Sequence, residues 1–128
     1  MTLVTRADVT PFYGQVEISD PGKRDYPRFM TGHERVVAIP GCIAVVTRGD
    51  QEGKVWIEVR RGESDASADG FECVFDGDLV LAGDDAAVGN TIGNELHQVR
   101  LGPGRDRVKA FTSPVGGLAH TVRLLVQD

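Results

Sequence analysis

The sequence has few of the residues on which recognisable catalytic or metal chemistry depends. Its 128 residues include two cysteines, three histidines and one tryptophan. There is no Cys-x-x-Cys pair for a zinc knuckle, and the histidines lack the spacing of a metal-binding pair. The Gly-x-Ser-x-Gly, His-Glu-x-x-His and glycine-rich phosphate-binding motifs are missing as well. These absences favour a protein without cofactor or catalytic activity, although a carboxylate and histidine site of unfamiliar pattern would escape such a search.

Long hydrophobic runs are also missing. No apolar stretch approaches the roughly 18 residues needed to span a bilayer, and the first residues lack the basic-then-apolar layout of a secretory signal. We therefore expect a cytoplasmic protein with no membrane segment. Cys42 and Cys73 agree with this compartment, because both lie in apolar stretches where a free cysteine usually behaves as a small buried hydrophobe.

Short alternating patterns are what the sequence has in quantity. Val55, Ile57 and Val59 fall on one side of an extended chain, with Trp56 on the other. No segment sustains the apolar period of a helix. Similar strand patterns occur at residues 12–18, 35–39, 43–48, 54–60, 71–74, 79–81, 96–101, 107–112 and 119–127. With an apolar content of 41%, the chain is predicted to form one all-β domain over residues 1–128, an antiparallel β-sandwich of seven or eight short strands.

The connections between these segments suggest which strands pair. A Gly- and Asp-rich stretch joins residues 43–48 to 54–60, which predicts a hairpin, and the last two strand patterns predict another. Residues 76–78 form either a turn between two strands or a bulge within one long strand. Residues 84–94 carry the turn residues of an irregular loop.

Charge is distributed in blocks along the chain, whose formal net charge is −5. No lysine or arginine occurs between residues 62 and 99, and five bases then follow, from Arg100 to Arg123. This segregation allows two interpretations: the acids decorate loops and pair with the later bases across a sheet, or they gather on one interaction surface. The acids of the first block are Glu63, Asp65, Asp69, Glu72, Asp76, Asp78, Asp84, Asp85 and Glu95.

The second interpretation gives a functional hypothesis. An acidic patch repels nucleic acid but attracts a basic protein, and nucleases carry basic grooves because they must neutralise phosphates. We therefore expect a protein-binding module, of inhibitor or immunity type, that presents an acidic surface to a basic partner such as a nuclease. No direct nucleic-acid binding is expected. The partner-binding residues predicted on this basis are Asp65, Asp69, Asp76, Asp78, Asp84 and Asp85, with Trp56 as an anchor.

Two other functions stay open at this point. The aspartates at 76, 78, 84 and 85 could supply oxygen ligands to calcium in a β-sandwich that binds a small ligand or carbohydrate, although their spacing differs from that of an EF-hand loop. The chain could also have no activity beyond binding. Exposed edge strands further allow a homodimer through a sheet edge.

The order of the strand patterns has a likeness among known proteins. It runs from 12–18, through a Val-x-Ile-x-Val arm at 55–59 and an acidic strand at 71–75, to a Pro-Gly turn at 103–104 and a last strand at 122–126. This order resembles the competence J-type proteins, small β-sandwiches known as inhibitors of a DNA-entry nuclease. The chain departs from them at Arg105 and Asp106, where an aromatic residue is usual, and it lacks their closing tryptophan. The resemblance implies a β-sandwich with an inhibitor-like binding role.

Overall fold

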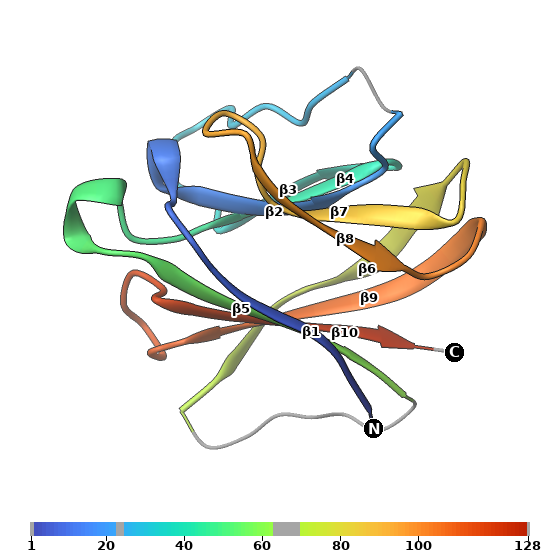
Figure 1. Cartoon of the computed structure of the whole chain (residues 1–128). Helices are drawn as coiled ribbons and strands as arrows, with labels where there is room; N and C mark the ends of the chain where they lie inside the picture. Colours follow the sequence, from blue (N-terminus) through green and yellow to red (C-terminus); the bar gives the residue numbers. More distant parts are fainter. Residues whose placement is uncertain (1, 23–24, 63–69, 128) are drawn as a thin grey trace.

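Apolar residues at alternate strand positions bring two five-stranded β-sheets face to face (Figure 1). The computed structural model describes residues 2–22, 25–62 and 70–127. In order across the first sheet lie β1 (Thr2–Val9), β5 (Val55–Arg61), β10 (Thr121–Gln127), β9 (Gly104–Ser113) and β6 (Glu72–Leu81). The second sheet has the order β3 (Val36–Ile39), β4 (Cys42–Val46), β2 (Gln15–Ser19), β7 (Asp85–Asn90) and β8 (Glu95–Arg100). The predicted sandwich is confirmed.

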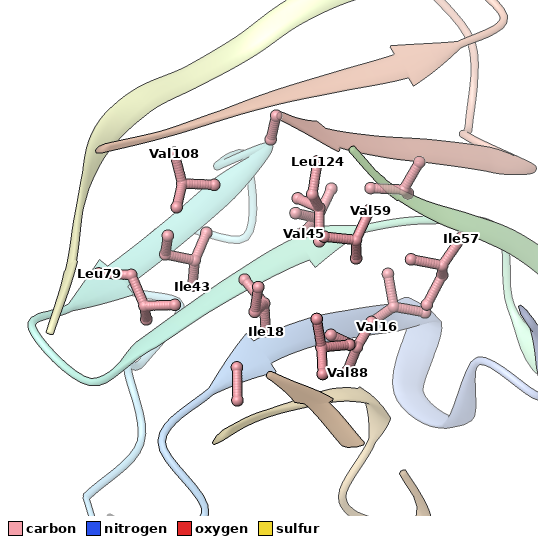
Figure 2. Close-up of a cluster of buried hydrophobic side chains, with 14 of the residues drawn as sticks. Val16, Ile18, Ile43, Val45, Ile57, Val59, Leu79, Val88, Val108 and Leu124 are labelled. Carbon is pink, nitrogen blue, oxygen red and sulfur yellow. The ribbon is translucent and has the colours of Figure 1, made fainter. Parts of the chain in front are cut away.

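The core lies between the sheets and consists of β-branched residues and leucines. Figure 2 shows side chains from β2 and β4 that point toward those of β5, β9 and β10. Val55, Ile57 and Val59 are fully buried, as their alternation predicted. Burying one such side chain contributes roughly 1.5–3 kcal/mol, so this interior is the main source of stability.

The sides of the sandwich are held by contacts between the edge strands of the two sheets. Strand β1 contacts β8 on one side, and β6 contacts β3 and β4 on the other. An ion pair of 2.8 Å joins Arg35, before β3, to Glu72 of β6. The Val80 N–H donates to the Pro40 carbonyl at 2.6 Å. These contacts fix how the two sheets sit on each other.

Three predictions about the strands are wrong. The described residues form ten strands where seven or eight were expected. The sequence patterns did not identify the N-terminal segment and residues 85–90 as strands. Residues 43–48 and 54–60 form no hairpin: β4 belongs to the second sheet and β5 to the first. The pairing is not wholly antiparallel, because β5 and β10 run parallel. The closing β9–β10 hairpin is confirmed, and residues 72–81 are one long strand with a register shift between Cys73 and Phe75.

Residues 12–14 form a short 3-10 turn, η1 (Phe12–Gly14), where a continuous strand was expected. Tyr13 has φ 60°, an uncommon left-handed conformation for a residue with a side chain, and its ring is largely exposed. A second such turn, η2 (Asp50–Glu52), lies against η1 (Figure 1). The described residues contain no helix long and apolar enough to cross a membrane.

The two cysteines differ in their surroundings. Cys42 of β4 is buried, as predicted, whereas Cys73 is exposed and the prediction of burial was wrong for it. Cys73 lies near the start of β6, whereas Leu79 and Leu81 near the end of the same strand are buried, so an apolar local stretch does not by itself decide burial. Both thiols are free.

Candidate functional site

The structure separates the residues predicted to bind a partner. Asp65 and Asp69 lie outside the described residues. Asp76, Asp78 and Trp56 lie on the solvent side of the first sheet, Trp56 beneath the guanidinium of Arg6, which is 5.6 Å from the ring centre. The remaining two, Asp84 and Asp85, lie where the chain passes from β6 into β7 of the second sheet.

Arginines that follow in the sequence compensate three of these aspartates. Arg107 donates from Nε and Nη2 to the two oxygens of Asp76, each at 2.8 Å, and this hydrogen bonding lowers the pKa of Asp76. The other two pairs are looser, with Arg105 at 3.6 Å from Asp78 and Arg100 at 3.5 Å from Asp84. The interpretation in which acids pair with later bases is therefore confirmed here, and the acids of β6 do not form an uncompensated patch.

The aspartates expected to bind calcium do not converge. Asp76 and Asp78 belong to a strand face, whereas Asp84 and Asp85 belong to the following turn. In the part of the chain that the structure describes, no three His, Cys, Asp or Glu side chains are arranged to hold a metal ion. The structure thus gives no support to a calcium site between residues 76 and 85.

The three histidines do not come together in one site. His97 lies on β8 and His120 just before β10, so they belong to different sheets. His33 lines a pocket beside Glu34. The Glu34 carboxylate accepts hydrogen bonds from the backbone N–H of Glu34 and from that of Met30, and these lower the pKa of Glu34 to about 2. A carboxylate of that pKa is a weak general base near neutral pH.

A continuous hollow on the solvent side of the second sheet is the best candidate for a functional site. It consists of three adjoining pockets of about 360, 90 and 190 Å³. Asp20 and Pro21 line both the first and the second pocket, and Tyr26 and Thr91 line both the second and the third. We call this hollow the trough. Its other lining residues include Glu17, Asp25, Cys42, Asp84, Asp85, Ala87, Ile92, Leu96 and Gln98.

One end of the trough is acidic. Asp84 is exposed at its rim, and the Asp85 carboxylate accepts a hydrogen bond of 2.5 Å from the Gln98 side chain. Asp20 accepts from the Gly22 N–H and from the Ala82 N–H, both at 3.0 Å, and so joins the end of β2 to the β6–β7 turn. Asp20 therefore shapes this end, while Asp84 is only loosely paired with Arg100 and Asp85 forms no ion pair with a described residue.

The other end is walled by apolar and aromatic groups above a buried carboxylate. Tyr26, Ile92 and Leu96 are each at least 40% exposed there. Below them Glu17 accepts a hydrogen bond of 3.0 Å from the Thr91 N–H, and the Cys42 thiol lies 3.5 Å from its other oxygen.

The chemistry of Cys42 is limited by these surroundings. Burial, and after it the negative charge of Glu17, raise the pKa of the Cys42 thiol far above its usual range. A thiol is a nucleophile only when it ionises. The site is therefore suited to binding and not to covalent catalysis through Cys42.

Sequence reasoning missed most of the trough. Glu17 falls on the polar side of the alternating segment at 12–18, which predicts an exposed side chain, yet it is only 4% exposed. Nothing in the local pattern shows that Tyr26 and Thr91 line a pocket above it. Tyr26 itself carried a weak signal, as an aromatic residue in a polar stretch.

Comparisons with known proteins identify the fold. No protein-family model matches the chain, and no curated protein matches its sequence. Among solved structures it is similar to ComJ from Bacillus subtilis, an inhibitor of the DNA-degrading activity of NucA. The similarity covers 100% of this chain and 98% of that one, with a TM-score of 0.77 and 14% sequence identity. The resemblance to competence J-type proteins is thus confirmed at the level of the fold.

Proposed function

We propose that this chain is a protein-binding module of the inhibitor type, and that its partner is a nuclease with a basic surface. The observation that carries the proposal is the similarity to ComJ over the full length of both chains. Function is carried by sites and not by folds, so a surface suited to such a partner is needed in addition.

The trough supplies that surface. Its lining contains four carboxylates near the solvent and no lysine or arginine among the described residues. Asp84 and Asp85 stand at its open end, where Arg100 is the one described cation close by, at 3.5 Å from Asp84. Such a surface attracts a basic protein and accelerates its association, because opposite charges steer the encounter.

A rival surface lies on the first sheet. It contains Asp76, Asp78 and Trp56. We rank it second, because both of its described aspartates are ion-paired, Asp76 through two hydrogen bonds of 2.8 Å, whereas in the trough Asp84 has only a loose pair with Arg100 and Asp85 forms no ion pair with a described residue. Removing a cation from an aspartate to bind another gains little.

Inhibition of DNA digestion tests the proposal. The immobilised full chain captures partners from a lysate of the source organism, and each captured nuclease is purified. Its digestion of plasmid DNA is then followed while the chain is added. We expect digestion to fall until the two proteins are equimolar. If no nuclease of that organism is bound and inhibited, the proposed function is wrong.

Two matched double variants separate the surfaces. D84N/D85N and D76N/D78N each remove two negative charges without changing side-chain size. We expect D84N/D85N to weaken inhibition at least about tenfold, the effect of roughly 1.4 kcal/mol, and D76N/D78N to weaken it less. The reverse result would leave the inhibitor function standing and move its surface to the first sheet.

A further inference from the structure

Glu17 is a buried carboxylate that lies outside the hydrophobic core. It points to the solvent side of β2, opposite to Val16 and Ile18, and is only 4% exposed. The Thr91 N–H and the Cys42 thiol are its two hydrogen-bond donors, at 3.0 and 3.5 Å. Among the described residues no lysine, arginine or histidine forms an ion pair with it.

This environment leaves Glu17 with binding capacity. An ionised carboxylate has about four acceptor sites, and two donors fill only some of them. A buried carboxylate with no cation is costly, and the usual compensation is a paired positive charge. Glu17 therefore favours the approach of a cation to this end of the trough.

The pocket above Glu17 has the size and walls for a single cationic side chain. Its volume is about 190 Å³, below the roughly 300–1,000 Å³ of pockets that hold drug-sized ligands. Tyr26 and Ile92, both about half exposed, stand at its mouth, and Gln15 and Thr91 complete the lining. An aromatic ring attracts a cation through its π-face, and the apolar wall suits an aliphatic stem.

We propose that this pocket binds the end of a lysine or arginine side chain presented by a protein partner, with Glu17 as the counter-charge and Tyr26 as the wall. The proposal rests on the proposed function in that it requires a protein partner with a basic surface. It goes further by naming the group recognised and the residues that recognise it. The acidic end of the trough then steers the partner, and the Glu17 pocket holds one of its side chains.

Two small cations, butylguanidinium and butylammonium, test the pocket without the partner. Each is titrated into the full chain while amide chemical shifts are recorded by NMR. We expect saturable shifts at the Thr91 amide, which donates to Glu17, and at residues 26 and 92. Glu17→Gln should weaken binding about tenfold, since the charge is lost while the amide oxygen still accepts from Thr91. Glu52→Gln, the same change at an exposed residue of η2, should leave it unchanged.

Further measurements separate binding from folding. We expect Glu17→Gln to melt at the same temperature as the parent chain or higher, because an uncompensated buried charge is removed. Tyr26→Ala, at a half-exposed position, should keep the fold and weaken probe binding. Equal probe binding by Glu17→Gln and the parent chain would overturn the proposal. So would tighter binding by K23A/R24A, because the chain's own cations would then occupy the pocket.

The probe experiment and the inhibition experiment fail independently. Cation binding at Thr91 with no nuclease inhibited would retain the pocket and refute the proposed function. Inhibition of a nuclease with no saturable shift at Thr91 would retain the function and refute the pocket.

Discussion

Asn90 shows how one buried polar side chain organises an end of the second sheet. Its amide nitrogen donates to the carbonyls of Phe12 at 3.0 Å and Gln15 at 2.8 Å, and its oxygen accepts from the Gly93 N–H at 2.8 Å. It is 1% exposed. The side chain therefore holds η1, the start of β2 and the β7–β8 turn together, next to the pocket above Glu17.

Replacing Asn90 by alanine should destabilise the protein. Three hydrogen bonds are lost, and partly buried backbone groups are left without partners, so we expect the free energy of unfolding to fall by roughly 3 kcal/mol. Urea unfolding followed by circular dichroism measures this. Gln98→Ala removes an amide that is exposed on β8 and should change stability by less than about 0.5 kcal/mol. Equal losses in the two variants would contradict the role given to Asn90.

Single residues were predicted well where burial alone decided their place. Val55, Ile57 and Val59 alternate with polar neighbours, and hydrophobic burial put them inside. Glu17 was beyond reach, because its burial depends on side chains from a distant loop and turn. Tyr13 was predicted in a strand, whereas it lies in the turn η1 with φ 60°. An aromatic residue rarely adopts that conformation, so its residue type gave no sign of the turn.

At the scale of elements, an ion-pair group joins the parallel strands β5 and β10 on the solvent side of the first sheet. Glu58 of β5 accepts hydrogen bonds of 3.1 Å from the Nε atoms of Arg60 and Arg123. Burial alone would raise the pKa of Glu58, but the hydrogen bonds from these two arginines outweigh it and the pKa is lowered. Arg123 also stacks on the Phe71 ring at 4.2 Å.

This lowered pKa makes stability depend on acid in a defined direction. The folded state holds Glu58 ionised, so its stabilisation is complete well above the unfolded pKa of about 4.5 and is lost as the pH falls through the lower folded pKa. In Glu58→Gln the unfolding free energy should therefore decline less steeply below about pH 4.5 than in the parent chain. Denaturant unfolding over a pH series measures both slopes, and Glu52→Gln serves as the control that should keep the parent slope. Parallel slopes for Glu58→Gln and the parent chain would count against this account.

Elements were predicted where β-branched residues alternate, and missed where small residues form the strand. Strand β7 contains the turn residues Gly89 and Asn90 beside two alanines, which are less common in strands than β-branched residues, yet only glycine fits at position 89. A Cβ there would lie 2.1 Å from the Glu95 carbonyl oxygen. Which strands pair is harder to predict than where the strands lie. Strands β4 and β5 are separated by η2 and belong to different sheets, and the turn residues between them do not distinguish this arrangement from a hairpin.

At the scale of the whole molecule, the sheet edges lie against each other and not against solvent alone. Strand β1 meets β8, and the Arg35–Glu72 ion pair joins the β3 side to β6. Covered edges are a common protection against edge-to-edge association. We therefore keep the trough as the proposed binding surface, and the homodimer expected from the sequence stays a prediction.

The charge blocks of the sequence were visible from the start, but their pairing was not. Acids of β6 and bases of β9 are far apart in the chain and adjacent in the sheet, so Asp76 meets Arg107 and Asp78 meets Arg105. Asp84 meets Arg100 in the same way, at 3.5 Å, while Asp25 and Asp85 of the trough form no ion pair with a described residue.

The salt dependence of association follows from this division. Raising the salt concentration from 0.1 to 1 M shortens the screening length from about 10 to 3 Å, so we expect the association rate with the nuclease partner to fall at least about tenfold. Stopped-flow mixing over a salt series measures it. D84N/D85N should lower the rate at low salt and flatten its dependence on salt. D76N/D78N should stay closer to the parent chain, because Arg107 and Arg105 already screen those carboxylates. Identical slopes for the two variants would show that the trough does not steer the partner.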